Sequence, residues 1–125
     1  MEADQVEETP ARPAVPSAAV TQRYLNLKLT EIGVTPAANL EDSLNDGLRL
    51  IALTEFVSGK QLPRFNKNPR TMTMRSENIE RLFCFLRDSC NLKLHPQLCP
   101  GVTRNDQISA ISVIYHLALR YTVLG

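Results

Sequence analysis

The densest run of apolar residues lies near the middle of the chain, between residues 44 and 57. Apolar side chains fall there on more than one side of a helix, so we expect a central helix that packs on several faces. Residues 39–43 include side chains that can accept the free N–H groups of a first turn, and we expect the helix to start there and run to Ser58. Gly59 suits the end of the helix, and Pro63 prevents it from resuming. The apolar positions are Leu44, Leu48, Ile51 and the stretch 53–57.

Two further segments have the spacing of a helix with one apolar face. The first extends from Val20 to Ile32 with Gly33 as a stop, and it predicts a helix over residues 18–32. The second starts at Ser76, and its apolar residues recur every three or four positions. These apolar residues are Ile79, Leu82, Phe83, Leu86 and Cys90. The polar side of the same helix carries Glu80, Arg81, Arg87 and Asp88.

The C-terminal segment predicts a fourth main helix, because residues 108–124 are apolar nearly all round. Thr103 and Asp106 have the spacing of a capping box, with Asp in place of Glu, so we expect this helix to follow them. Residues 91–101 contain His95-Pro96 and Pro100-Gly101, which allow a turn or two of helix at most. The pattern as a whole indicates an all-α fold with four main helices and short connecting helical turns.

The first 17 residues differ in composition from the rest of the chain. They contain four acidic residues and three prolines but almost no large apolar side chain, so burial would offset little of the entropy lost on ordering. We predict a disordered acidic tail over residues 1–17 and a single domain over residues 18–125. A chain of 125 residues is long enough for one domain with a real core.

Composition argues against several classes of function. The formal net charge is only +1, whereas nucleic-acid binding favours a strongly basic domain. No apolar run reaches the roughly 18 residues of a membrane span, and no secretory signal is evident, so we expect a cytoplasmic protein. Cys84, Cys90 and Cys99 lack the paired spacing of a zinc site, and we interpret them as reduced thiols. We find no catalytic constellation and expect no enzymatic activity, metal or cofactor.

One segment concentrates positive charge on this nearly neutral chain. Five basic residues and no acidic residue lie between positions 60 and 75. Such a segment would attract an acidic filament by Coulomb interaction, although a solvated loop kept polar for solubility fits the residues equally well. The five residues are Lys60, Arg64, Lys67, Arg70 and Arg75.

Several motifs resemble those of the calponin-homology domain. The expected core helix contains Asp46-Gly47-Leu48 and ends at Ser58-Gly59-Lys60. The next helix contains Glu77-Asn78-Ile79, and the last contains Leu117-Ala118-Leu119-Arg120-Tyr121. The match covers about residues 18–124 and is most similar to the first domain of the tandem pair in filamins, α-actinins and spectrins. This resemblance implies the calponin-homology fold, F-actin as the partner and a place in the cytoskeleton.

The resemblance also implies where the partner would bind. To the basic segment it adds Tyr115, His116 and Arg120 of the last helix and Arg23 and Asn26 of the first. The chain departs from the family pattern in having no tryptophan, and Tyr24 and Tyr115 stand at the positions where the family usually has one. In addition, Arg104-Asn105 replaces an Asp-Gly pair before the last helix.

Two other functions stay open at the level of sequence. Calponin-homology domains also serve as microtubule or ciliary attachment modules, and the basic segment fits acidic tubulin as well as acidic actin. The apolar last helix suits a scaffold or self-association domain instead, if its outer face packs on another protein. The sequence does not set the oligomeric state, for which a monomer is the default expectation.

Overall fold

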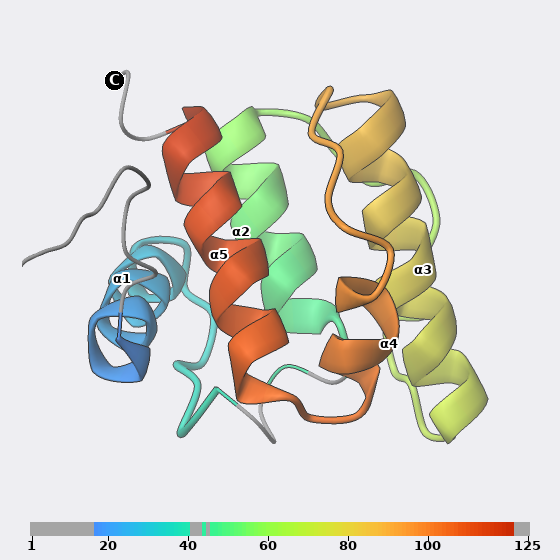
Figure 1. Ribbon diagram of the computed structural model, residues 1–125, viewed down its shortest axis with the longest axis horizontal. Helices are drawn as coiled ribbons and strands as arrows, with labels where there is room; N and C mark the ends of the chain where they lie inside the picture. The colour runs from blue at the N-terminus through green and yellow to red at the C-terminus, as the bar shows by residue number, and fades with distance from the viewer. Residues whose placement is uncertain (1–16, 41–43, 45, 122–125) are drawn as a thin grey trace, which may run out of the picture.

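The computed structural model describes residues 17–40, 44 and 46–121, and this part of the chain is helical with no strand. The helices α2, α3 and α5 run side by side, α1 packs on α2 and α5, and α4 packs on α3 and α5 (Figure 1). Four long helices and one short helix confirm the predicted all-α class. The elements are α1 (Ala18–Glu31), α2 (Leu48–Ser58), α3 (Met72–Asp88), α4 (Leu98–Thr103) and α5 (Gln107–Tyr121).

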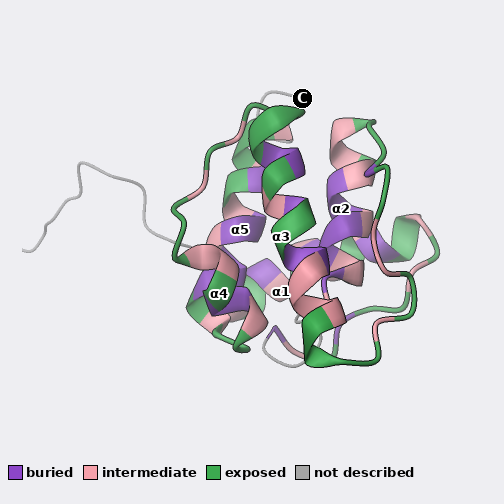
Figure 2. Ribbon diagram, turned by 90° about the vertical axis from the view of Figure 1, so that its right-hand side faces the viewer, coloured by how far each residue is buried: buried purple, intermediate pink, exposed green. Residues whose placement is uncertain are grey.

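The predicted central helix is confirmed as α2, which contacts α1, α3 and α5. Leu50 and Leu53 have no exposed surface, and Ile51 is 2% exposed. The buried positions of the other helices face the same interior, while their outer faces are exposed (Figure 2). Burial of these apolar side chains is the main stabilising contribution to the bundle.

The predicted start of the central helix near residues 39–43 is wrong, because α2 begins at Leu48. Gly47 has a left-handed backbone with φ of +82°, which a continuous right-handed helix cannot include. The carboxylate of Asp46 caps the helix instead, since its Oδ1 accepts the N–H of Leu48 at 3.0 Å. Leu44 is buried as expected but precedes the helix, and residues 41–43 lie outside the described residues.

The helix predicted over residues 18–32 is confirmed to within one residue. Its first turn is capped by Ser17, whose Oγ accepts the N–H of Val20 at 3.2 Å. The next amphipathic helix starts four residues before the expected Ser76, because Thr71 caps it through an N–H bond from Met74 at 3.1 Å. The amphipathic pattern identified this helix but not its first, more polar turn.

The connector before the last helix contains a single short helix, α4, as predicted. The capping box at Thr103 is wrong, because Thr103 ends α4 and its hydroxyl donates to the carbonyl of Cys99 at 3.1 Å. Asp106 caps α5 instead, accepting the backbone N–H groups of Ile108 and Ser109. Asn105 has a φ of +65° and thus adopts the left-handed conformation that the family's glycine would favour.

Two predictions fall partly on residues that the structure does not describe. The acidic tail, except for Ser17, lies outside the described residues, as does the end of the last helix beyond Tyr121. Within residues 17–40, 44 and 46–121, no helix is long and apolar enough to cross a membrane.

Candidate functional site

The connection between α2 and α3, residues 59–71, is fastened to the helices by one buried side chain. Asn78 of α3 has no exposed surface, and its Nδ2 donates to the carbonyl oxygens of Asn66 at 2.9 Å and Asp46 at 2.8 Å. Its Oδ1 accepts the backbone N–H of Asn66 at 2.7 Å. One amide therefore fixes both the middle of the connection and the turn before α2.

Further hydrogen bonds fix the connection on either side of this point. The backbone N–H of Leu62 donates to Glu55 Oε2 of α2 at 2.8 Å. The side-chain amide of Asn66 donates to the carbonyl of Met74 at 3.1 Å and to Glu77 Oε1 at 3.0 Å. Because the backbone is held at three points, its exposed side chains project from a defined framework.

The five basic residues of this segment do not share one environment. Arg64, Lys67 and Arg70 are exposed on the connection, and the Lys67 ammonium lies 5.7 Å from the centre of the Phe65 ring. Lys60 is also exposed, but its ammonium donates to the carbonyl of Ser89 at the end of α3. Arg75 lies half-buried in the first part of α3. The three middle residues thus form the freest group of cations.

The candidate residues of α5 are partly occupied by contacts within the protein. Tyr115 is half-buried and meets the ring of His116 edge to face, with 5.8 Å between ring centres. His116 Nδ1 lies 2.6 Å from the carbonyl oxygen of Ser112, which can only accept, so the proton is on Nδ1. Arg120 Nε donates to the carbonyl of Cys90 at 3.2 Å. His116 and Arg120 nevertheless present exposed surface.

The same helix carries exposed apolar side chains and one perturbed tyrosine. Ile108 is 68% exposed and Leu119 is 40% exposed, so α5 presents apolar groups outward as well as inward. The guanidinium of Arg120 lies 5.5 Å from the centre of the Tyr121 ring. Burial, followed by a hydrogen bond to Cys90, raises the pKa of Tyr121 to about 12. Tyr121 therefore stays neutral at physiological pH.

The polar side of α1 is less open to solvent than the sequence suggests. Asn26 is bonded twice to Ala37, donating to its carbonyl at 3.0 Å and accepting its N–H at 2.7 Å. Gln22 donates to the carbonyl of Ala38 at 2.9 Å, and Thr21 is buried. Asn26 thus has a structural task in holding the segment after α1. Arg23 is exposed.

The candidate residues do not form one continuous patch. The connection follows the outer edge of α3, whereas α1 lies on the other side of the α2–α5 pair (Figure 1). Contacts agree with this view, since α1 packs on α2 and α5 but not on α3. A partner that touched all of the predicted residues would have to extend around the domain.

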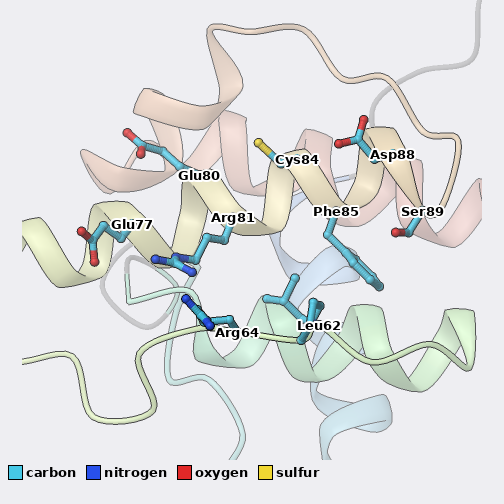
Figure 3. A pocket seen from close by; sticks show the side chains of 10 residues that line it. Leu62, Arg64, Glu77, Glu80, Arg81, Cys84, Phe85, Asp88 and Ser89 are labelled. Carbon is cyan, nitrogen blue, oxygen red and sulfur yellow. The ribbon is translucent and has the colours of Figure 1, made fainter.

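A groove that the sequence analysis did not predict lies between the connection and α3 (Figure 3). Its volume is about 560 Å³, and Arg64 and Arg81 both face it. Arg81 had been interpreted only as part of the solvated side of its helix. Nothing in the spacing could have indicated the groove, because Arg64 and Arg81 belong to different elements. Its lining is Leu62, Pro63, Arg64, Glu77, Glu80, Arg81, Cys84, Phe85, Asp88 and Ser89.

Among the described residues, no cluster of three His, Cys, Asp or Glu side chains could hold a metal ion. Cys84 is exposed, Cys90 is buried and Cys99 is half-buried, each as a free thiol. Burial, together with the nearby Glu80 and Cys84, raises the pKa of Cys99. A raised pKa keeps this thiol protonated and unreactive.

Comparison with known proteins gives relatives of one kind, although no family model matches the chain. Over 50 residues, 40% of this chain, it is 48% identical to filamin-A of Drosophila melanogaster, covering 2% of that protein. It is 27% identical to alpha-actinin-like protein 1 of Schizosaccharomyces pombe over 101 residues, which are 81% of this chain and 16% of that protein. It is 25% identical to cortexillin-2 of Dictyostelium discoideum over 101 residues, which are 80% of this chain and 23% of that protein.

These relatives and the helical fold agree with the motifs recognised in the sequence. The chain is a calponin-homology domain, most like those of the filamin and α-actinin type. It spans less than a quarter of the length of each of these relatives.

Proposed function

We propose that this chain is a non-enzymatic cytoskeletal module that binds F-actin through the basic connection between α2 and α3. The likeness to filamin and α-actinin supports actin as the partner, since that type of calponin-homology domain implies actin binding. A cytoplasmic, cytoskeletal location belongs to the same proposal.

The observation that carries the proposal is the fastening of the connection by Asn78. Binding costs less conformational entropy when the backbone that bears the contact residues is already ordered. Arg64, Lys67 and Arg70 project from such a backbone and remain exposed. A solvated loop without a binding role would not need three separate anchors to the helices. The positive charge would in addition accelerate encounter with an acidic filament.

The α5 and α1 residues have secondary roles in this proposal. His116 and Arg120 are exposed near the half-buried Tyr115, and Arg23 is exposed on α1. They lie away from the connection, so they would extend the contact rather than form its centre. Asn26 contributes by holding the segment after α1 in place.

Co-sedimentation tests the proposal directly. The full chain is pelleted with F-actin and, in parallel, with stabilised microtubules across a salt series up to physiological ionic strength. We expect saturable pelleting with F-actin that weakens as salt screens the basic connection but persists at physiological salt. Pelleting with microtubules alone would replace actin by tubulin as the partner. Failure with both filaments would overturn the proposal and direct attention to the exposed apolar side chains of α5.

A further inference from the structure

Two arginines from different elements converge on the groove beside α3. Arg64 extends from the fastened connection and Arg81 from α3, and their guanidinium groups point toward one another (Figure 3). Two like charges repel each other, so this arrangement is unfavourable without an anion between them. Among the described residues, neither guanidinium has a hydrogen-bond or ion-pair partner.

The acidic residues that line the groove are directed elsewhere. Glu77 accepts a hydrogen bond from Asn66 at 3.0 Å. Asp88 is paired with Arg87 at 2.8 Å. Glu80 points away from the arginines in Figure 3, on the side where it raises the pKa of Cys99 of α4. The two guanidiniums are therefore uncompensated within this groove.

The floor of the groove is apolar. The Phe85 side chain points from α3 toward Leu62 of the connection, and each residue is 8% exposed (Figure 3). Pro63 adds further apolar surface beside them. An apolar floor next to paired arginines fits a peptide segment that carries a carboxylate beside a large apolar side chain. Arginine binds carboxylates with two parallel hydrogen bonds, and interface arginines often dominate affinity.

We infer that this groove is part of the filament interface and that Arg64 and Arg81 together bind a carboxylate of the partner while Leu62 and Phe85 receive its apolar neighbour. This inference rests on the proposed function and extends it by adding Arg81, which lies outside the basic connection. It also gives Arg64 a role that Lys67 and Arg70 do not share. The occupant is an acidic, partly apolar segment of F-actin.

Charge neutralisation at Arg81 tests the inference in co-sedimentation. We expect R81Q to weaken F-actin binding by about tenfold or more, because it removes one side of the carboxylate site. The matched control is R87Q on the same helix, whose arginine is paired with Asp88 and does not line the groove. R87Q should bind within about twofold of the unmodified chain. Both arginines are exposed, so thermal unfolding should be nearly unchanged.

The exposed thiol of Cys84 provides a second measurement, since it lines the same groove. Alkylation by iodoacetamide is followed by peptide mass spectrometry with and without saturating F-actin. We expect the filament to slow modification of Cys84 severalfold in the unmodified chain.

The outcomes separate this inference from the proposed function. If the unmodified chain does not pellet with F-actin, both fail together. If it pellets but R81Q binds as tightly as R87Q, the role of Arg81 is overturned and actin binding stands. If R81Q binds weakly but Cys84 stays fully reactive in the complex, the groove is not occupied and this inference fails.

Discussion

The side chain of Asn78 on α3 is hydrogen-bonded to both the N–H and the carbonyl of Asn66, at 2.7 and 2.9 Å. An amide that pairs with both backbone groups of one residue imitates a strand pairing, and here it does so in an all-helical domain. The same side chain reaches the carbonyl of Asp46, so the turn before α2 and the basic connection depend on one residue.

Replacement of Asn78 by leucine should destabilise the domain by about 2–3 kcal/mol, because the variant leaves three backbone groups without partners. Urea unfolding followed by circular dichroism measures this loss. Asn68→Ala is the control, since Asn68 is exposed on the same connection and its variant should change stability by less than about 0.5 kcal/mol. An equal effect of the two substitutions would show that Asn78 does not fasten the connection.

Reversal of the three exposed cations, in R64E/K67E/R70E, should abolish pelleting with F-actin while leaving the helical circular dichroism nearly unchanged. The reason is that the variant converts an attractive field into a repulsive one without altering buried groups. The control R87E/K93E/R104E changes three other exposed cations and therefore shifts the net charge by the same amount. Comparable loss in both variants would indicate a response to net charge alone.

Much of the fold could be predicted because it depends on apolar periodicity. Leu50 and Leu53 are in the core, and Ile79, Leu82 and Leu86 face it from α3, as their spacing indicates. The start of α2 could not be obtained in this way. The left-handed Gly47 lies against Asn78, which follows it by 31 positions, and no local pattern reports such a contact.

The candidate site was predicted less completely than the fold, for a related reason. Counting charges found the basic segment but did not separate Arg64 from Lys60, whose ammonium is bonded to Ser89. Asn26 seemed to be a free polar group, although it is bonded to Ala37, which lies beyond the end of the helix. In each case the side chain's role depends on a partner that only the folded chain brings near.

The glycines at the two ends of α2 should differ in their tolerance of alanine. Both have positive φ, +82° for Gly47 and +71° for Gly59, so alanine costs about 1 kcal/mol at each from backbone strain alone. At Gly47 an added Cβ would also lie 2.9 Å from the Cβ of Asn78, whereas at Gly59 it would meet nothing within 4 Å. Gly47→Ala should therefore be less stable than Gly59→Ala by at least about 1 kcal/mol in urea unfolding. Equal stability would mean that the backbone near Gly47 shifts freely.

The cap of α5 should make part of the stability depend on pH. The hydroxyl of Ser109 donates to Asp106 Oδ2 at 2.6 Å, and this bond, aided by backbone N–H groups, lowers the pKa of Asp106. Because the folded pKa lies below the unfolded value of about 3.9, the stabilisation is present above that value and is lost as pH falls through the folded pKa. The difference in unfolding free energy between the unmodified chain and D106A should therefore be larger at pH 7 than at pH 2.5.

Ser109→Ala tests whether the hydroxyl is the main cause. This variant should retain the backbone bonds to Asp106 and lose the largest contribution to the shift, so nuclear magnetic resonance titration should find its Asp106 pKa closer to the ordinary value than in the unmodified chain. If the Asp106 pKa were the same with and without the hydroxyl, the cap would depend on the N–H groups of Ile108 and Ser109. The pH dependence would then belong to the start of the helix itself rather than to the Ser109 side chain.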